Sequence, residues 1–172
     1  IGENPMAVSP EEILARLKKI SDTGAEGKFV IDFRVAAQFA HVNKLFLSEK
    51  KDLMQTYAFA EGMAAAIGAD GEKQDMIFRG FSGLKGAELL DEIGGTVDEL
   101  LKLLDEKLHA DPVVPGMYDV ITAPEVTGLI AHEAFGHGVE MDMFVKERAL
   151  AKEYLGKKVA SDITSMKDGA AS

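Results

Sequence analysis

Two segments of the chain repeat apolar residues every three or four positions, the period of an amphipathic helix with one buried face. Residues 10–20 carry one such stripe and residues 97–108 carry the other. Ser9 precedes the first segment and Glu12 follows three positions later, a capping-box pattern that marks the start of a helix. Thr96 stands in the same relation to the second segment. We therefore predict a helix over each segment.

The residues between these helices predict strands. More and less apolar side chains alternate over residues 29–36, as in a strand with one buried face. Residues 41–44 are typical of a turn, and residues 68–71, with two glycines, of another. For residues 59–67 a helix is an open alternative, because Ala and Met favour helices. The pattern predicts an antiparallel sheet of about four strands over residues 29–81, packed against the helices, and hence an α+β fold.

A domain boundary is predicted where prolines and a glycine interrupt the pattern. Residues 111–116 contain two prolines and a glycine after the second helix. We assign residues 1–115 to an N-terminal α+β domain and residues 116–172 to the start of a second domain. Within the second domain we expect a short strand at residues 117–121 and a helix at residues 146–154.

Charge and composition exclude several classes of function. The chain has 19 basic and 29 acidic side chains and a net charge of −10. Binding that rests on Lys and Arg neutralising phosphates is therefore not expected, whether to nucleic acid or to an anionic membrane. No apolar run approaches the roughly 20 residues that cross a bilayer. The first residues also lack a signal-peptide pattern, so we predict a cytoplasmic protein without direct nucleic-acid or membrane contact.

The candidate chemistry lies in a third predicted helix, which begins near Thr122 with another capping-box pattern. It carries His132-Glu133-x-x-x-His137, a variant of the H-E-x-x-H motif of zinc proteases. Four-residue spacing puts two imidazoles on one helix face, whereas five-residue spacing turns them about 140° apart. Either the motif is accidental, or the helix contains one extra residue as a π-bulge. In the second case Gly136 offers a place for unusual backbone angles.

The motif predicts a division of roles if both imidazoles hold zinc. Glu133 would deprotonate the attacking water and pass the proton to the leaving amine. Zinc would lower the pKa of that water toward ~7 and polarise the scissile carbonyl. A catalytic zinc site normally has three protein ligands, and the sequence offers two obvious ones, His132 and His137. The chain contains no cysteine, so no thiolate within it can be the third.

The other histidines and nearby carboxylates have plainer interpretations. His41 is expected to be an ordinary polar residue. His109, near the end of the second predicted helix, can bind the exposed carbonyl groups there. Glu140 and Asp142 have three open interpretations: one of them completes the metal site, they support the metal ligands through hydrogen bonds, or they face water.

Several segments resemble one known family. Residues 118–142, which contain the H-E-A-F-G-H block, closely resemble the TldD/PmbA family, once called modulators of DNA gyrase. Residues 155–162, and residues 78–88 upstream, also fit the layout of this family. The resemblance runs from about residue 10 to the end of the chain, and its specificity lies mainly in the histidine block.

The resemblance implies a zinc metalloprotease in which His132 and His137 bind the metal and Glu133 is the catalytic base. It also implies peptides or unstructured protein segments as substrates, and a homodimer or a heterodimer with another family subunit. Family members are much longer and take their third zinc ligand from a C-terminal cysteine, so we expect this chain to be a fragment or a short relative. The alternative is a non-catalytic structural or regulatory subunit, against which the presence of Glu133 argues.

Overall fold

The computed structural model describes residues 2–167. The chain forms two compact units, Ile1–Val113 and Val114–Ser172, called unit 1 and unit 2 below. None of the helices within residues 2–167 is long and apolar enough to cross a membrane. Each unit has its own secondary structure, and each is described by itself.

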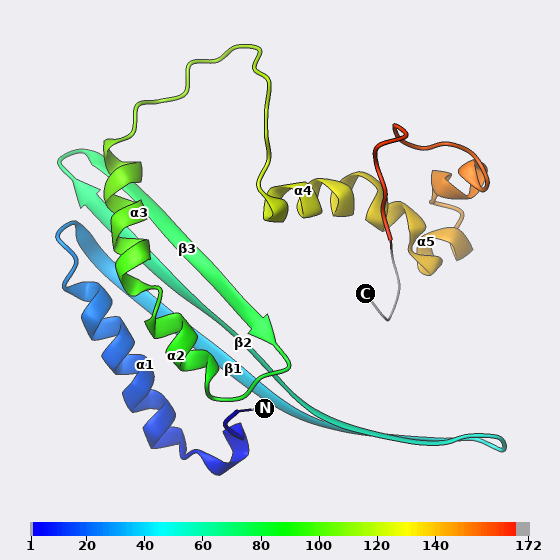
Figure 1. Ribbon diagram of the computed structural model, residues 1–172, viewed down its shortest axis with the longest axis horizontal. Coiled ribbons are helices and arrows are strands. Elements are labelled where there is room, and N and C mark those ends of the chain that lie inside the picture. The colour runs from blue at the N-terminus through cyan, green and yellow to red at the C-terminus, as the bar shows by residue number, and fades with distance from the viewer. Residues whose placement is uncertain (1, 168–172) are drawn as a thin grey trace. The chain divides into compact units, whose positions relative to one another are not determined.

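Unit 1 is built on an antiparallel sheet with the strand order β1-β2-β3 (Figure 1). The strands are β1 (Val30–Leu47), β2 (Asp52–Asp70) and β3 (Lys73–Gly83). Phe33 of β1 pairs with Ala66 of β2, and this register places both side chains on the face that the helices cover. The predicted α+β class is confirmed, although the sheet described over residues 2–167 has one strand fewer than predicted.

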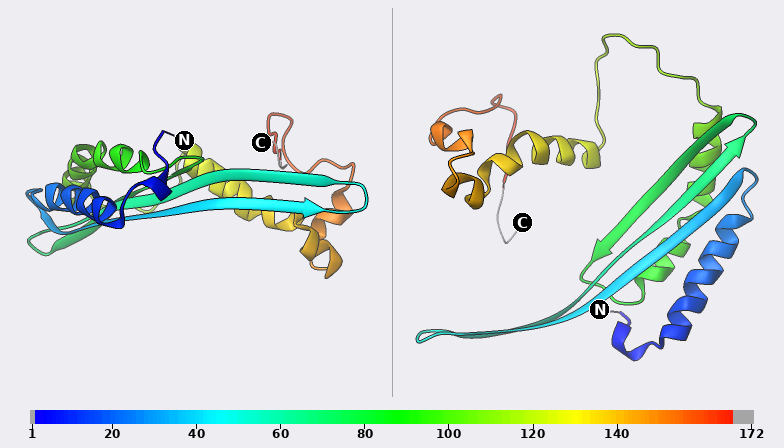
Figure 2. Two further views of the ribbon diagram at one scale, coloured as in Figure 1. Left: turned by 90° about the horizontal axis from the view of Figure 1, so that it is seen from below. Right: turned by 180° about the vertical axis from the view of Figure 1, so that it is seen from behind.

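Four helical elements of unit 1 are η1 (Pro5–Ala7), α1 (Pro10–Ala25), α2 (Leu89–Gly94) and α3 (Val97–His109). In Figure 2, left, the α-helices run along one face of the sheet. Small residues at alternate positions of β2 let the large side chains of α2 and α3 approach the sheet closely, as expected for a tightly packed core. The buried core consists of Ile20, Phe33, Ala60, Ala64, Ala66, Leu89, Leu90, Ile93, Val97, Leu100, Leu104 and Leu108.

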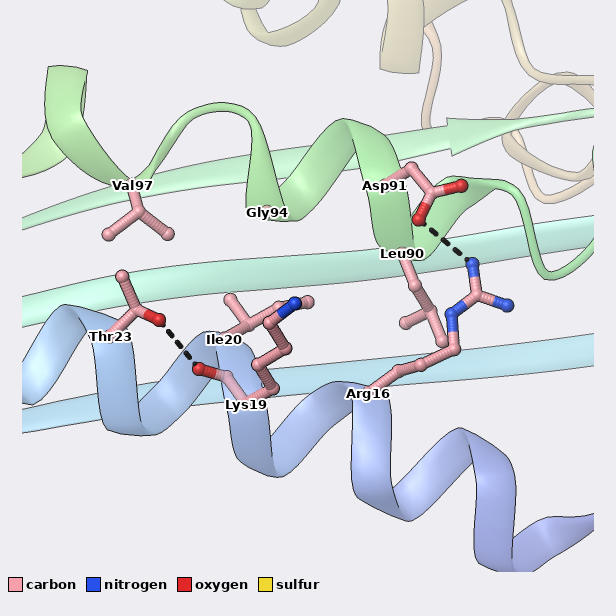
Figure 3. Close-up of a pocket in the computed structure, with 8 residues that line it drawn as sticks. All are labelled: Arg16, Lys19, Ile20, Thr23, Leu90, Asp91, Gly94 and Val97. Carbon is pink, nitrogen blue, oxygen red and sulfur yellow. Dashed lines mark hydrogen bonds and ion pairs between the residues drawn. The ribbon is translucent and has the colours of Figure 1, made fainter.

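One arginine ties α1 to the segments beside it. The guanidinium of Arg16 donates to Glu3 Oε2 at 2.7 Å, to the Ala87 carbonyl oxygen at 3.0 Å and to Asp91 Oδ1 at 3.1 Å. The hydrogen bond to Glu3 is the main cause that raises the pKa of Arg16. Arg16 also lines a pocket between α1 and α2, where Figure 3 shows its contact with Asp91. The contacts of Arg16 therefore join three segments that are distant in sequence.

The two predicted caps of unit 1 had different outcomes. Ser9 caps α1 as predicted, because its hydroxyl accepts the N–H of Glu12 at 3.1 Å. Thr96 precedes α3, but its hydroxyl donates to the carbonyl of Ile93 at 2.8 Å and makes no capping hydrogen bond. The prediction for Thr96 was wrong because α2 ends at Gly94, two residues earlier, and offers the Ile93 carbonyl as acceptor.

The hairpin of β1 and β2 is longer than predicted. Residues 41–44, predicted as a turn, continue β1, and His41 lies opposite Ala58. The chain reverses only after β1 ends, where the N–H of Ser48 donates to the carbonyl of Lys51 at 2.8 Å. The helix considered for residues 59–67 is also absent, since these residues belong to β2. Pairing with strands on both sides outweighs the helix propensity of Ala and Met.

Unit 2 consists of short helical elements. Its helix α4 (Pro124–Ala131) is followed directly by η2 (His132–Gly136), a π-helical turn, and by η3 (His137–Val139), a 3-10 turn. Further along the described residues of the unit lie α5 (Met141–Val145) and η4 (Leu150–Tyr154). This order places the whole candidate motif on one continuous run of helical backbone.

Two local predictions for unit 2 were wrong. Residues 117–121 form no strand, because no second segment pairs with them in the described part of the unit. Residues 146–154 are helical only over the 3-10 turn at their end. Unit 2 also has little core of its own: Ala149 is the one buried residue among its described positions. The exposed apolar side chains of α4 are Val126, Leu129 and Ile130.

Candidate metal centre

The two histidines of the motif are separated by a π-helical turn. The N–H of His132 still donates to the carbonyl of Gly128, four residues earlier, as in an α-helix. The N–H of His137 donates to the carbonyl of His132, five residues earlier. The helix therefore contains the extra residue that the five-residue spacing requires. Of the two alternatives that the sequence left open, the structure has the π-bulge.

Gly136, in this turn, does not have the unusual backbone angles that were expected of it. Gly136 has φ −55° and ψ −52°, which are ordinary angles for a right-handed helix. The prediction of unusual backbone angles at this position was therefore wrong. The extra residue is accommodated by the change in the hydrogen-bond pattern between His132 and His137.

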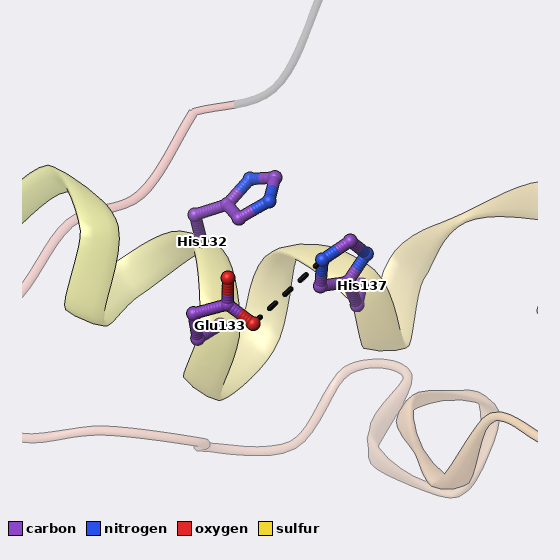
Figure 4. Close-up of side chains that lie close together, drawn as sticks. All are labelled: His132, Glu133 and His137. Carbon is purple, nitrogen blue, oxygen red and sulfur yellow. Dashed lines mark ion pairs between the residues drawn. The ribbon is translucent and has the colours of Figure 1, made fainter.

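The π-helical turn brings the three side chains of the motif together. The ring centroids of His132 and His137 lie 4.4 Å apart, with an angle of 67° between the ring planes. One potential ligand atom from each of His132, Glu133 and His137 lies within 4.8 Å of the others. Figure 4 shows the Glu133 carboxylate beside the two rings, with its ion pair to His137, and all three side chains are exposed. The ligand atoms of the group can thus be reached by a metal ion.

His137 contacts a carboxylate at each of its ring nitrogens. Its Nε2 lies 3.8 Å from Oε2 of Glu133, and its Nδ1 lies 2.8 Å from Oε1 of Glu140. Asp142 instead forms an ion pair with Lys146 at 2.7 Å. Of the two carboxylates that follow the motif, Glu140 therefore touches a candidate ligand, and Asp142 pairs with a neighbouring lysine.

The other two histidines lie in unit 1. His41 is an exposed residue of β1. His109 is the last residue of α3, and its Nδ1 lies 2.8 Å from the carbonyl oxygen of Asp105, as expected for a residue that binds exposed carbonyls. This hydrogen bond, with a second contact to Asp70 at 2.9 Å, raises the pKa of His109.

The donor set of the motif suits a divalent transition metal. Imidazole nitrogen and carboxylate oxygen are both ligands that Zn²⁺ accepts, and two imidazoles with one further ligand leave a position for water or substrate. Within residues 2–167, the side chains that lie close enough together to hold a metal ion are those of His132, Glu133 and His137. The side chains therefore fit a metal through two imidazole ligands, with a carboxylate beside them.

Comparison with known proteins agrees with the site. Residues 115–171 match the PmbA/TldA metallopeptidase C-terminal domain. A protein named "Metalloprotease" from Methanothermobacter thermautotrophicus is 28% identical over 165 residues, covering 89% of this chain and 35% of that protein. "Metalloprotease MJ0996" from Methanocaldococcus jannaschii is 36% identical over 63 residues, covering 37% of this chain and 14% of that protein.

A third relative extends the comparison to another archaeon. A "Metalloprotease" from Archaeoglobus fulgidus is 30% identical over 83 residues, covering 48% of this chain and 20% of that protein. This chain thus spans about a third or less of the length of these relatives. No solved structure matches the chain. The family match over the motif and the similarity to the Methanothermobacter protein across most of the chain support a metallopeptidase-type protein that resembles the TldD/PmbA family.

Proposed function

We propose that the chain contributes to a zinc-dependent peptidase that cleaves peptides or unstructured protein segments. The observation that carries this proposal is the convergence of His132, Glu133 and His137 on a π-helical turn. On a regular α-helix the two imidazoles would point about 140° apart, too far for one metal ion. Two histidines five residues apart can bind the same metal ion only if the helix contains an extra residue between them, and the π-helical turn provides it.

Each side chain has a distinct role in the proposal. His132 and His137 hold the zinc ion, which when bound supplies Lewis-acid activation of water and of the scissile carbonyl. The carboxylate of Glu133 accepts the proton of the attacking water and then donates it to the nitrogen of the leaving amine. Glu133 suits this role because it is adjacent to one ligand and lies 3.8 Å from a ring nitrogen of the other.

The proposed class of substrate rests on the family resemblance. The side chains of Glu133 and His137 are 62% and 50% exposed in this chain, which covers 35% of its Methanothermobacter relative. We propose flexible peptides as substrates, and a cytoplasmic location, on the resemblance.

The proposal requires one ligand beyond the two imidazoles. A catalytic zinc ion normally has three protein ligands, and this chain contains no cysteine. We assign the third ligand to a further part of a longer polypeptide or to another subunit. This fits the proposal that the protein works as a homodimer or as a heterodimer with another family subunit. A second candidate function, a non-catalytic regulatory subunit, is favoured by the presence of only two imidazoles.

Replacing Glu133 by Gln separates these two functions. For the peptidase we expect Glu133→Gln to retain zinc and to lose roughly 10²–10⁴-fold in the rate of cleavage of an unstructured fluorogenic peptide. The matched control is Glu125→Gln in the first turn of α4, which removes the same charge upstream of the motif and should leave the rate unchanged. An unaltered rate in Glu133→Gln would sink the assignment of the base. Absence of cleavage by the wild-type protein would favour the regulatory subunit.

A further inference from the structure

We infer that Glu140 is a positioning residue, which fixes the ring of His137 so that Nε2 is presented to the metal. This inference rests on the proposed function. It concerns a residue outside the His-Glu-His group. The observation behind it is the 2.8 Å contact between Nδ1 of His137 and Oε1 of Glu140.

The contact determines which ring nitrogen is free. An ionised carboxylate can only accept a hydrogen bond, so Nδ1 of His137 must carry the hydrogen. In a neutral imidazole the lone pair then lies on Nε2. Nε2 is also the nitrogen nearer Glu133, at 3.8 Å, and so it faces the remainder of the motif. The hydrogen bond thus selects the tautomer that can bind a metal on this side.

The backbone places Glu140 where its carboxylate can do this. Glu140 follows the 3-10 turn η3, in which side chains three positions apart lie nearly in line. Its own carbonyl accepts the N–H groups of Met143 and Phe144, at 3.1 and 3.2 Å. These bonds fix the backbone of Glu140 between η3 and α5, within reach of His137.

A purely structural role for the carboxylate is less well supported. Glu140 occupies the N-cap position of α5, but its side chain makes no capping hydrogen bond there. Asp142, two residues later, carries the same charge and pairs with Lys146. Asp142→Asn is therefore a matched control that changes the local charge equally without touching His137.

The first test reads the tautomer directly and needs no metal. In the ¹⁵N spectrum of the metal-free protein, above the titration range of imidazole, we expect His137 to be protonated at Nδ1 with a free Nε2. Glu140→Ala should abolish this preference, and Glu140→Gln should largely keep it, since the amide oxygen still accepts the hydrogen. An Nε2-protonated His137 in the wild type, or an unchanged tautomer in Glu140→Ala, would overturn the inference.

The second test measures the consequence for the metal. Zinc affinity is determined by competition with a chromophoric chelator, in the protein's native assembly. We expect Glu140→Ala to weaken zinc binding about 10–100-fold, Glu140→Gln to weaken it less, and Asp142→Asn to leave it unchanged. Equal losses in Glu140→Ala and Asp142→Asn, or no loss in Glu140→Ala, would refute a positioning role.

His137→Ala tests the proposed function separately. If this variant binds zinc as tightly as the wild type, His137 is not a ligand and the proposed metal centre fails, whatever the tautomer shows. If His137→Ala loses zinc while Glu140→Ala keeps full affinity, the metal centre stands and only the role of Glu140 is wrong.

Discussion

Alanine at Gly24 should destabilise unit 1, although alanine normally favours a helix. Gly24 lies in α1 against the ring of Phe33, which is only 5% exposed. A Cβ at this position would lie 2.4 Å from Cγ and Cδ2 of the ring and 2.5 Å from Cδ1. Carbon atoms in contact normally stand about 3.5–4.0 Å apart, so the ring would have to move by roughly 1 Å.

The size of the effect follows from two opposing contributions. Overpacking of a filled core costs about 1–3 kcal/mol. Replacing a helical glycine by alanine returns about 0.5–1 kcal/mol. We therefore expect a net loss of about 1 kcal/mol, within a range of about 0–2.5 kcal/mol, in the free energy of unfolding for Gly24→Ala. With a urea dependence of roughly 1–3 kcal/mol per molar, a loss of about 1 kcal/mol should lower the unfolding midpoint by about 0.3–1 M.

Gly94 in α2 provides the matched control. A Cβ there would lie 3.5 and 3.8 Å from atoms of Ile20, which is ordinary contact. Gly94→Ala should therefore raise the free energy of unfolding by about 0.4–1 kcal/mol. Urea unfolding followed by circular dichroism measures both variants. Stabilisation by Gly24→Ala, or an undiminished cost of Gly24→Ala in a Phe33→Leu background, would refute the packing of α1 on β1.

Two further predictions concern a histidine in unit 1 and the π-helical turn. The pKa of His109 is raised, chiefly by the hydrogen bond to the Asp105 carbonyl and then by Asp70. The contribution of His109 to the free energy of unfolding is therefore fully present below its unfolded pKa of about 6.5, and it is lost as pH rises through the higher folded pKa. Urea unfolding at a series of pH values measures this contribution, and His109→Gln should remove it. If the free energy of unfolding of His109→Gln varied with pH as that of the wild type does, the prediction would be contradicted. Gly136→Ala should keep the π-helical turn and its metal, because the nearest atoms to an added Cβ, in His132 and Met166, lie 3.7 Å away. Loss of zinc in Gly136→Ala, at unchanged helix content by circular dichroism, would show that the turn needs glycine.

The elements that the sequence predicts best are those whose signal is local. Ser9 and the apolar stripe after it define the start of α1, and the structure has that helix and that cap. The extent of the β1–β2 hairpin has no such signal. The reversal after β1, at residues 48–51, has the sequence Ser-Glu-Lys-Lys, without glycine or proline. Residues 59–67 are rich in alanine, and they are a strand because strands pair with them on both sides.

In the candidate site, too, the features with a local sequence signal are predicted and those that depend on the backbone path are not. His132, Glu133 and His137 are close in sequence, so the motif indicates the group and the helical phase offers the π-helical turn as one of two alternatives, which the structure decides. The contact of His137 with Glu140 depends on the 3-10 turn between them, which no periodicity in the sequence indicates. Sequence spacing left the roles of Glu140 and Asp142 equivalent, and only the backbone path distinguishes them.

The central claim is that His132 and His137 hold a zinc ion, and the metal content of the purified native assembly tests it most directly. Elemental analysis after dialysis should give close to one zinc ion for each copy of the motif. His132→Ala should lose it, whereas His109→Ala, at a histidine bound to Asp105 and Asp70, should retain it. Absence of zinc from the wild-type assembly, or the same zinc content in His132→Ala, would contradict the account.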